Sequence, residues 1–327
     1  MNATAAHDLE RIAAPVPKSG AGADRAFELI TKAAAWFVLL LLGGVALSMA
    51  WGGRLAFQTF GWHFVTGKDW DVVGAKFGAF VPIYGTLVTS AIALVIAVPV
   101  SIGIALFLTD IAPRWSRGPI AIAIELLAAI PSIIYGMWGL FVFAPFMAQH
   151  VEPWLTDHLG DKALIGPLFS GPPIGIGMLT AGIVLGIMVI PFIASVAREV
   201  FSAVPAPLRE SAVALGSTRW EILSRVTLPY TRSAIIGAVF LGLGRALGET
   251  MAVTFVLGNA HDLSASLLMP SNSIAAAIAN EFTEADTDLY RSSLIALGFL
   301  LFVVTFIVLT IAKLLLLRVN RQLGRTS

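Results

Sequence analysis

The sequence contains no cysteine, which excludes disulfide bonds, thiolate catalysis and cysteine-ligated metal sites. Charge is also scarce, because only 13% of the 327 residues are Asp, Glu, Lys or Arg, against about a quarter in a typical soluble domain. Hydrophobic residues make up 57% of the chain. This composition is typical of a protein that crosses a membrane several times. The formal net charge of +1, without interleaved basic and aromatic residues, gives no sign of nucleic-acid binding.

Several catalytic and cofactor motifs are missing. The sequence has no G-x-x-x-x-G-K-[ST] nucleotide-binding loop and no H-E-x-x-H zinc motif. The segment 149–173 has five residues of metal-ligating type without a recognised ligand spacing, namely His150, Glu152, Asp157, His158 and Asp161. We therefore expect no metal and no cofactor in this chain. A membrane-embedded enzyme is the least favoured function, because the apolar stretches contain no nucleophile–base set.

Six apolar stretches are long enough to cross a hydrocarbon core of about 30 Å, which takes roughly 20 helical residues. The predicted fold class is an all-α membrane protein with six transmembrane helices. Pro99, Pro131 and Pro145 predict kinks in the second and third stretches. The predicted spans are 33–51, 81–109, 119–148, 174–196, 233–258 and 293–317.

The basic residues predict the orientation. With the N-terminus inside, the inner segments carry 15 of the 21 Lys and Arg residues, and the outer loops carry five. Cytoplasmic loops are enriched in Lys and Arg, so both termini are predicted to be cytoplasmic. A signal peptide cleaved near Ser48-Met49-Ala50 is disfavoured, because 32 residues, eight of them charged, precede the first apolar run and that run is longer than a normal signal-peptide core.

The domain organisation follows from these spans. Residues 1–32 are predicted to be a mobile cytoplasmic tail, and 33–80 the first span with an outer segment. Trp51, Trp62 and Trp70 in that region favour anchoring along the membrane interface. The core is predicted at 81–317, including an inner loop at 197–232, and 318–327 form a second cytoplasmic tail.

The inner loop 197–232 predicts a compact helical knob. Pro205 and Pro207 favour the start of a helix, and Gly216 favours its end. Ser217-Thr218 can cap a second helix that runs to Leu228-Pro229. On charge alone, an ordinary basic inner loop is the favoured interpretation of this segment.

The spacing within this loop resembles the cytoplasmic signature of ABC importer permeases: EAA, three residues, G, nine residues, I, one residue, LP. In "ESAVALGSTRWEILSRVTLP", 210–229, five positions match, and Ser211 and Val226 are mild departures. The resemblance implies a coupling helix that docks on a separate ATPase, with ATP-Mg on that partner. The positions concerned are Glu210, Ser211, Ala212, Gly216, Val226, Leu228 and Pro229.

The fifth span carries two opposite charges, Arg245 and Glu249, four positions apart. On a continuous helix they can pair, but such a pair stabilises an exposed helix by only a few tenths of a kcal/mol. An arginine at bilayer depth costs at least about 2.5–3.5 kcal/mol. From the residues alone, a structural ion pair and a contact with a charged substrate are equally favoured. Gly244 and Gly248 predict a small-residue face where another helix approaches closely.

"RALGETMAVTFVLGN", 245–259, resembles the phosphate importer permeases, and Met251 favours the PstC-type subunit over its PstA-type partner. "ELLAAIPSIIYGMWGL", 125–140, and "IANEF", 278–282, resemble the same family. The resemblance implies that Arg245 and Glu249 take part in phosphate movement. Glu125 is the other carboxylate in a span, and we favour its reaching to the cytoplasmic interface over a pathway role.

This resemblance implies a type I ABC importer permease fold and a transport subunit without enzymatic activity of its own. The implied partners are a PstA-type permease, a cytoplasmic ATPase dimer and an external phosphate-binding protein, and the implied mechanism is alternating access. Two alternatives stay open: an importer permease for another oxyanion or solute, and a secondary transporter or channel that works without a motor.

Overall fold

The computed structural model describes residues 21–323, with side chains for residues 22–318. The chain divides into two compact units, 1–48 and 49–327. The described part of the first unit is helical and belongs to α2 (Ala21–Gly52). The predicted N-terminal tail is therefore helical from Ala21, and its residues 1–20 lie outside the described residues.

Six helices in the described residues are long and apolar enough to cross a membrane, as predicted. Spans two, four and six lie close to their predicted positions. Spans three and five are corrected below. The six candidate spans are Gly22–Gly52, Phe80–Ile111, Ser132–Leu159, Met178–Ser202, Arg219–Leu247 and Asp288–Arg318.

The core of the second unit is the packing of α5 (Phe80–Leu106) against α10 (Met178–Ser202). Small side chains line this seam, so the two backbones approach closely. A Cβ atom on Gly182 would lie 2.6 Å from Cβ of Ile92. Helices α7 (Ser132–Trp138), α13 (Leu228–Leu247) and α14 (Met251–Leu257) pack against α10.

The third span begins later than predicted. Helix α6 (Arg114–Ala129) ends before Ile130 and Pro131, which have extended backbone angles, and α7 starts at Ser132. Proline disfavours the helical conformation of the residue before it, so Pro131 breaks the predicted span 119–148 instead of kinking it. The helix continues through η3 (Gly139–Phe143), α8 (Ala144–Phe146), η4 (Met147–Val151) and α9 (Glu152–Leu159).

The segment 149–173 is consequently not a simple outer loop. Helix α9 occupies its first part, and a short 3₁₀ helix, η5 (Gly166–Phe169), follows. Glu152 is fully buried, and one of its carboxylate oxygens accepts a hydrogen bond from the Gly175 backbone N–H at 2.8 Å. Within residues 22–318, no three His, Asp or Glu side chains gather as metal ligands.

The fifth span is shifted toward the inner loop and ends earlier than predicted. Helix α12 (Arg219–Ile222) continues without interruption through the π-helical turn η6 (Leu223–Thr227) into α13, which ends at Leu247. Residues 248–250 are not helical, and α14 starts again at Met251. The predicted span 233–258 is therefore two helices separated by a break.

The outer segment 52–80 folds against the last span. It comprises α3 (Arg54–Phe60), α4 (His63–Thr66) and an antiparallel hairpin of β1 (Trp70–Asp71) and β2 (Lys76–Phe77). Phe64 and Phe77 are buried with Leu294 of α16 (Asp288–Leu323). Trp51 and Trp62 are exposed, which fits the predicted interface anchoring.

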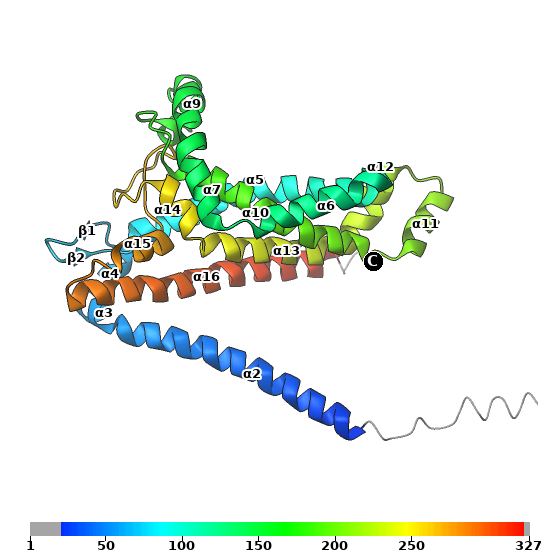
Figure 1. Cartoon of the computed structure of the whole chain (residues 1–327), viewed down its shortest axis with the longest axis horizontal. Coiled ribbons are helices and arrows are strands. Elements are labelled where there is room, and N and C mark those ends of the chain that lie inside the picture. The colour runs from blue at the N-terminus through cyan, green and yellow to red at the C-terminus, as the bar shows by residue number, and fades with distance from the viewer. Residues whose placement is uncertain (1–20, 324–327) are drawn as a thin grey trace, which may run out of the picture. The chain divides into compact units, whose positions relative to one another are not determined.

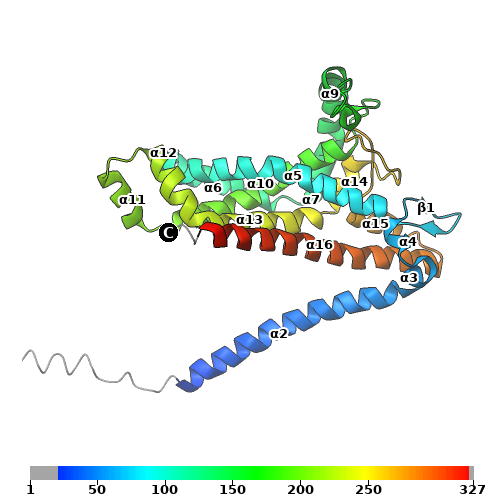
Figure 2. The same cartoon turned by 180° about the vertical axis from the view of Figure 1, so that it is seen from behind.

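The second unit has two distinct ends, both visible in Figures 1 and 2. One end carries α11 (Ala206–Ala214), α12 and the C-terminal part of α16. The other carries the hairpin, α3, α4 and α15 (Ile274–Glu281). The predicted tail 318–327 is helical up to Leu323, and residues 324–327 lie outside the described residues.

The α5–α10 seam gives a testable prediction. Gly182→Ala places a methyl group against Ile92, and overpacking of this kind costs about 1–3 kcal/mol, so we expect a lower melting temperature in detergent or nanodiscs. Gly103→Ala, on the exposed face of α5 with nothing within 4 Å of the new atom, is the matched control and should leave the melting temperature unchanged or raise it. Equal melting temperatures for the two variants would contradict the seam.

Candidate functional site

Arg245 and Glu249 do not form the ion pair that their spacing permits. Among the described residues, the ion pairs within 4.0 Å do not include these two side chains. The reason is the helix break: Arg245 belongs to the last turn of α13, whereas Glu249 lies beyond its end at Leu247. The signals were Gly248, a residue that favours helix C-termini, and Thr250, a residue that favours N-caps.

Arg245 and Glu249 lie in different surroundings. Arg245 is exposed, and its guanidinium carbon lies 5.8 Å from the ring centroid of Phe192 on α10, within cation–π range. Glu249 is half-buried, and its carboxylate accepts the backbone N–H of Ala252 at 3.3 Å. That bond satisfies one of the free N–H groups in the first turn of α14.

Two of the sequence stretches singled out above meet at this place. Gly136 of α7 faces α14 so closely that a Cβ atom would lie 2.9 Å from the Met251 carbonyl oxygen and 3.1 Å from Cα of Ala252. The Tyr135 hydroxyl donates to the Leu127 carbonyl at 2.9 Å, which bridges the break between α6 and α7. The segments 125–140 and 245–259 thus form one packed unit beside Arg245.

Gly244 and Gly248 face open space within this chain. A Cβ atom on Gly244 would have no neighbour within 4 Å, and one on Gly248 would meet only the Gly244 carbonyl at 3.7 Å. Gly242 is the glycine that lets a helix approach, since a Cβ there would lie 2.6 Å from Ile193 of α10. No described helix of this chain approaches Gly244 and Gly248 closely. A close helix at this face therefore stays a prediction, and it would have to come from another chain.

The inner loop folds as the predicted knob. Helix α11 ends before Gly216, whose φ of +82° is a left-handed conformation that favours glycine. Thr218 caps α12 in a capping box with Glu221. The second helix does not stop at Leu228-Pro229, because the π-helical turn η6 directly before them changes the backbone bonding pattern and lets the helix continue past the proline.

The signature residues of this loop have different exposures. Glu210 and Ser211 are exposed on α11, whereas Ala212 is buried. Val226 and Leu228 are half-buried, and Leu228 packs on the cluster around Phe201. Large apolar side chains nevertheless point to solvent on the same knob, namely Leu208, Val213, Leu215 and Trp220.

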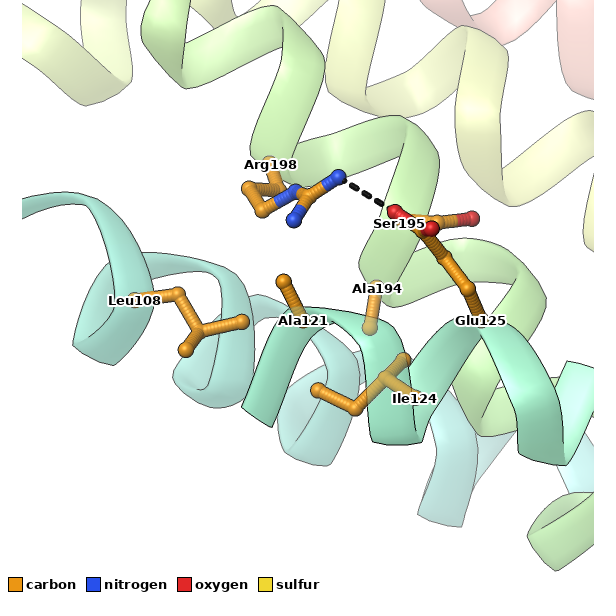
Figure 3. A pocket seen from close by; sticks show the side chains of 7 residues that line it. All are labelled: Leu108, Ala121, Ile124, Glu125, Ala194, Ser195 and Arg198. Atoms are coloured by element: carbon orange, nitrogen blue, oxygen red, sulfur yellow. Dashed lines mark hydrogen bonds and ion pairs between the residues drawn. The ribbon is translucent and has the colours of Figure 1, made fainter. Parts of the chain in front are cut away.

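Glu125 pairs across helices. Its carboxylate accepts a hydrogen bond from the Arg198 guanidinium at 2.7 Å, which ties α6 to α10 (Figure 3). The side chains of Ala121, Ala194 and Ser195 line the same hollow. Glu125 thus has an ion-pair partner. The sequence had suggested either a side chain that reaches the interface or a pathway residue, and neither interpretation included this pair.

A buried polar cluster surrounds Glu281 of the "IANEF" stretch. Glu281 accepts hydrogen bonds from Trp70 Nε1 and the Tyr290 hydroxyl, both at 2.7 Å, and its other oxygen lies 2.8 Å from His261 Nε2. Trp70 stacks on the His261 ring at 5.2 Å. Trp70 was expected to be an interface anchor, and no pattern in the sequence pointed to the three partners of Glu281, which are Trp70, His261 and Tyr290.

The surroundings of Glu281 lower the pKa of its carboxyl group. Burial is the largest single effect and opposes ionisation, but the hydrogen bonds from His261, Tyr290 and Trp70 together outweigh it, so the pKa of Glu281 lies below its ordinary value. The ionised carboxylate consequently fastens the hairpin and the 258–273 loop to α15 and α16.

A chain with these features is a polytopic membrane protein with an exposed helical knob between its fourth and fifth spans. It belongs to the family of binding-protein-dependent transport system inner membrane components, whose model matches residues 97–321. It is 62% identical to the phosphate transport system permease protein PstC of Xylella fastidiosa (strain Temecula1) over 93% of this chain and 94% of that one. It is 56% identical to PstC of Mesorhizobium japonicum over 92% of each chain. These relatives confirm the resemblance to PstC-type permeases.

The fold is confirmed as well. A solved structure of a bacterial ABC transporter involved in the import of the acidic polysaccharide alginate superposes with a TM-score of 0.55 at 18% identity. The match covers 92% of this chain and 98% of that chain. The chain therefore has the type I ABC importer permease fold and is a multi-pass transport subunit of the inner membrane.

The polar cluster gives a pH-dependent prediction. Because the pKa of Glu281 is lowered by folding, its contribution to stability is complete above the ordinary pKa of 4.5 and is lost as the pH falls through the lowered value. Glu281→Gln should therefore melt below the wild type at pH 7, and the gap should narrow as the pH falls below 4.5. Glu284→Gln, at an exposed carboxylate of the same loop, is the control. A gap independent of pH would contradict the prediction.

Proposed function

We propose that this chain is a translocation subunit of an ATP-driven importer of inorganic phosphate. The observation that carries the proposal is the exposed Arg245 inside a membrane-spanning helix. A guanidinium in a span costs too much to face lipid, so it faces protein or a water-filled cavity. It is permanently charged and offers a planar fork of donors that matches phosphate oxygens. The names of the relatives support phosphate as the anion.

The surface around Arg245 supports a second permease subunit as its cover. Gly244 and Gly248 leave space for a close helix on the same stretch of chain, and none of the described residues fills it. A PstA-type permease packed there would complete the pathway between the two subunits. Glu249 holds the start of α14 and keeps a negative charge nearby, so that repulsion limits how tightly an anion is held.

The knob supports a separate motor. Leu215 is 87% and Trp220 71% exposed, and such apolar side chains are unfavourable in a water-facing loop unless a protein covers them. A cytoplasmic ATPase dimer that carries ATP-Mg would bind α11 and α12, and its closure would be transmitted to the spans. In this orientation both termini are cytoplasmic, and a phosphate-binding protein docks at the end that carries the hairpin and α15.

The substrate role is tested by Arg245→Ala in the reconstituted importer. We expect phosphate uptake to fall at least tenfold while the subunits still co-purify. Arg245→Lys should recover only part of the uptake, because lysine lacks the planar fork. Arg114→Ala, at an exposed cytoplasmic arginine, is the control. Full uptake by Arg245→Ala in a normally assembled complex would disprove the role.

The same preparation separates the rival functions. Competition by excess sulfate or molybdate against labelled phosphate would favour a permease for another oxyanion. Uptake in vesicles that lack the ATPase would favour a secondary transporter or channel. The proposal requires uptake that depends on ATP and resists both competitors.

The docking role of the knob is tested with Trp220→Ala. Loss of this exposed indole should reduce co-purification of the ATPase several-fold, because Trp side chains contribute strongly to protein interfaces. Trp115→Ala removes an indole that is 80% exposed on α6, outside the knob, and should leave co-purification intact. If both variants retain the ATPase equally well, Trp220 is not part of the docking surface.

A further inference from the structure

Arg209 joins the coupling helix α11 to two membrane helices at once. One guanidinium nitrogen lies 3.0 Å from Oδ1 of Asp110, in the π-helical turn η2 (Phe107–Ile111) that ends α5. The other terminal nitrogen donates to the Phe201 carbonyl of α10 at 2.7 Å. Both side chains of the ion pair are largely sheltered, with 26% and 29% exposure.

The link is the polar connection between α11 and the spans. Within the described residues, the side-chain hydrogen bonds of α11 are those of Arg209 and a local one from Ser211 to Pro207. The two covalent ends of α11 are turns, Pro205 before it and Gly216 with its positive φ after it. Helix α11 also packs on η6 and α12, so without Arg209 it would keep its contact with the fifth span but lose its bonds to α5 and α10.

Helix α10 extends this connection toward the exposed arginine of the fifth span. Phe201 is fully buried among Ala105 of α5 and Ile235 of α13, so a displacement of its backbone moves a packed cluster. Phe192, whose ring lies under Arg245, is nine residues earlier on the same helix, about 13–14 Å away along its axis. Displacement of α11 thus reaches α5 and α10 together, and α10 carries the aromatic neighbour of Arg245.

We propose that Arg209 is a positioning residue for energy coupling: its bonds to Asp110 and Phe201 transmit the movement of the docked coupling helix to the α5–α10 pair. This inference rests on the proposed function. When the bonds are lost, the ATPase still binds the knob and hydrolyses ATP. The movement of α11 is then no longer transmitted to α5 and α10, because the flanking turns change conformation instead.

The test is the ratio of phosphate imported to ATP hydrolysed by the reconstituted importer with its binding protein. For Arg209→Ala we expect ATPase activity within about twofold of the wild type and a ratio lowered at least fivefold. Arg209→Lys, which keeps the charge but not two simultaneous bonds, should be intermediate. Asp110→Asn removes the ion pair almost without a change of shape, and should also lower the ratio even if Arg209→Ala assembles poorly.

Exchange of the two charges supplies the rescue. Arg209→Asp alone should uncouple, and its combination with Asp110→Arg should raise the ratio again, because the pair is restored with reversed polarity. Arg114→Ala should keep the wild-type ratio. An unchanged ratio in Arg209→Ala and Asp110→Asn, or an equal loss of uptake and ATPase activity in both, would overturn the inference. Failure of the wild-type complex to import phosphate would instead overturn the proposed function on which it depends.

Discussion

The close packing of α5 on α10 is the contact on which the rest of the second unit depends. Alanine and glycine at the seam, among them Ala93, Ala97 and Gly182, let the two helices approach with little side chain between them. Dispersion and buried backbone contact stabilise such a seam even where lipid is as apolar as the helices themselves. Helices α7, α13 and α14 pack on α10, and Arg209 of α11 is bonded to the end of α5 and to α10.

Most of the charged pairs lie at the two ends of the helices and not along the apolar α5–α10 seam. Polar pairs at the inner end link α6 to α10 and α11 to α5, whereas the outer end is held by hydrogen bonds to one ionised carboxylate, Glu281. Arg245 is different because, among the described residues, it takes part in no ion pair within 4.0 Å, and its guanidinium carbon lies 5.8 Å from the ring centroid of Phe192. The charged side chains that link these helices thus have partners within the chain. Arg245, which is exposed in a span, is the residue that we propose contacts the substrate.

The sequence was sufficient for the features that depend on local rules. Six apolar runs predicted six spans, and Gly216 and Thr218 predicted the corner of the knob correctly. Hydropathy could not resolve the breaks at Pro131 and at residues 248–250, because the residues on both sides are equally apolar. The partners of Glu281 come from segments far apart in the chain, so no local pattern could bring Trp70, His261 and Tyr290 together.

The exposed groups of this fold also bear on how the protein is made and retained in the cell. Under the proposed function, a copy inserted alone would leave the Arg245 guanidinium exposed in a span and the Leu215 and Trp220 side chains exposed to water. Other subunits would remove both unfavourable exposures by covering the Arg245 guanidinium and the apolar side chains of the knob. An orphan copy is therefore the form most open to aggregation or proteolysis, and the chemistry of these surfaces by itself favours balanced numbers of subunits, without a dedicated counting mechanism.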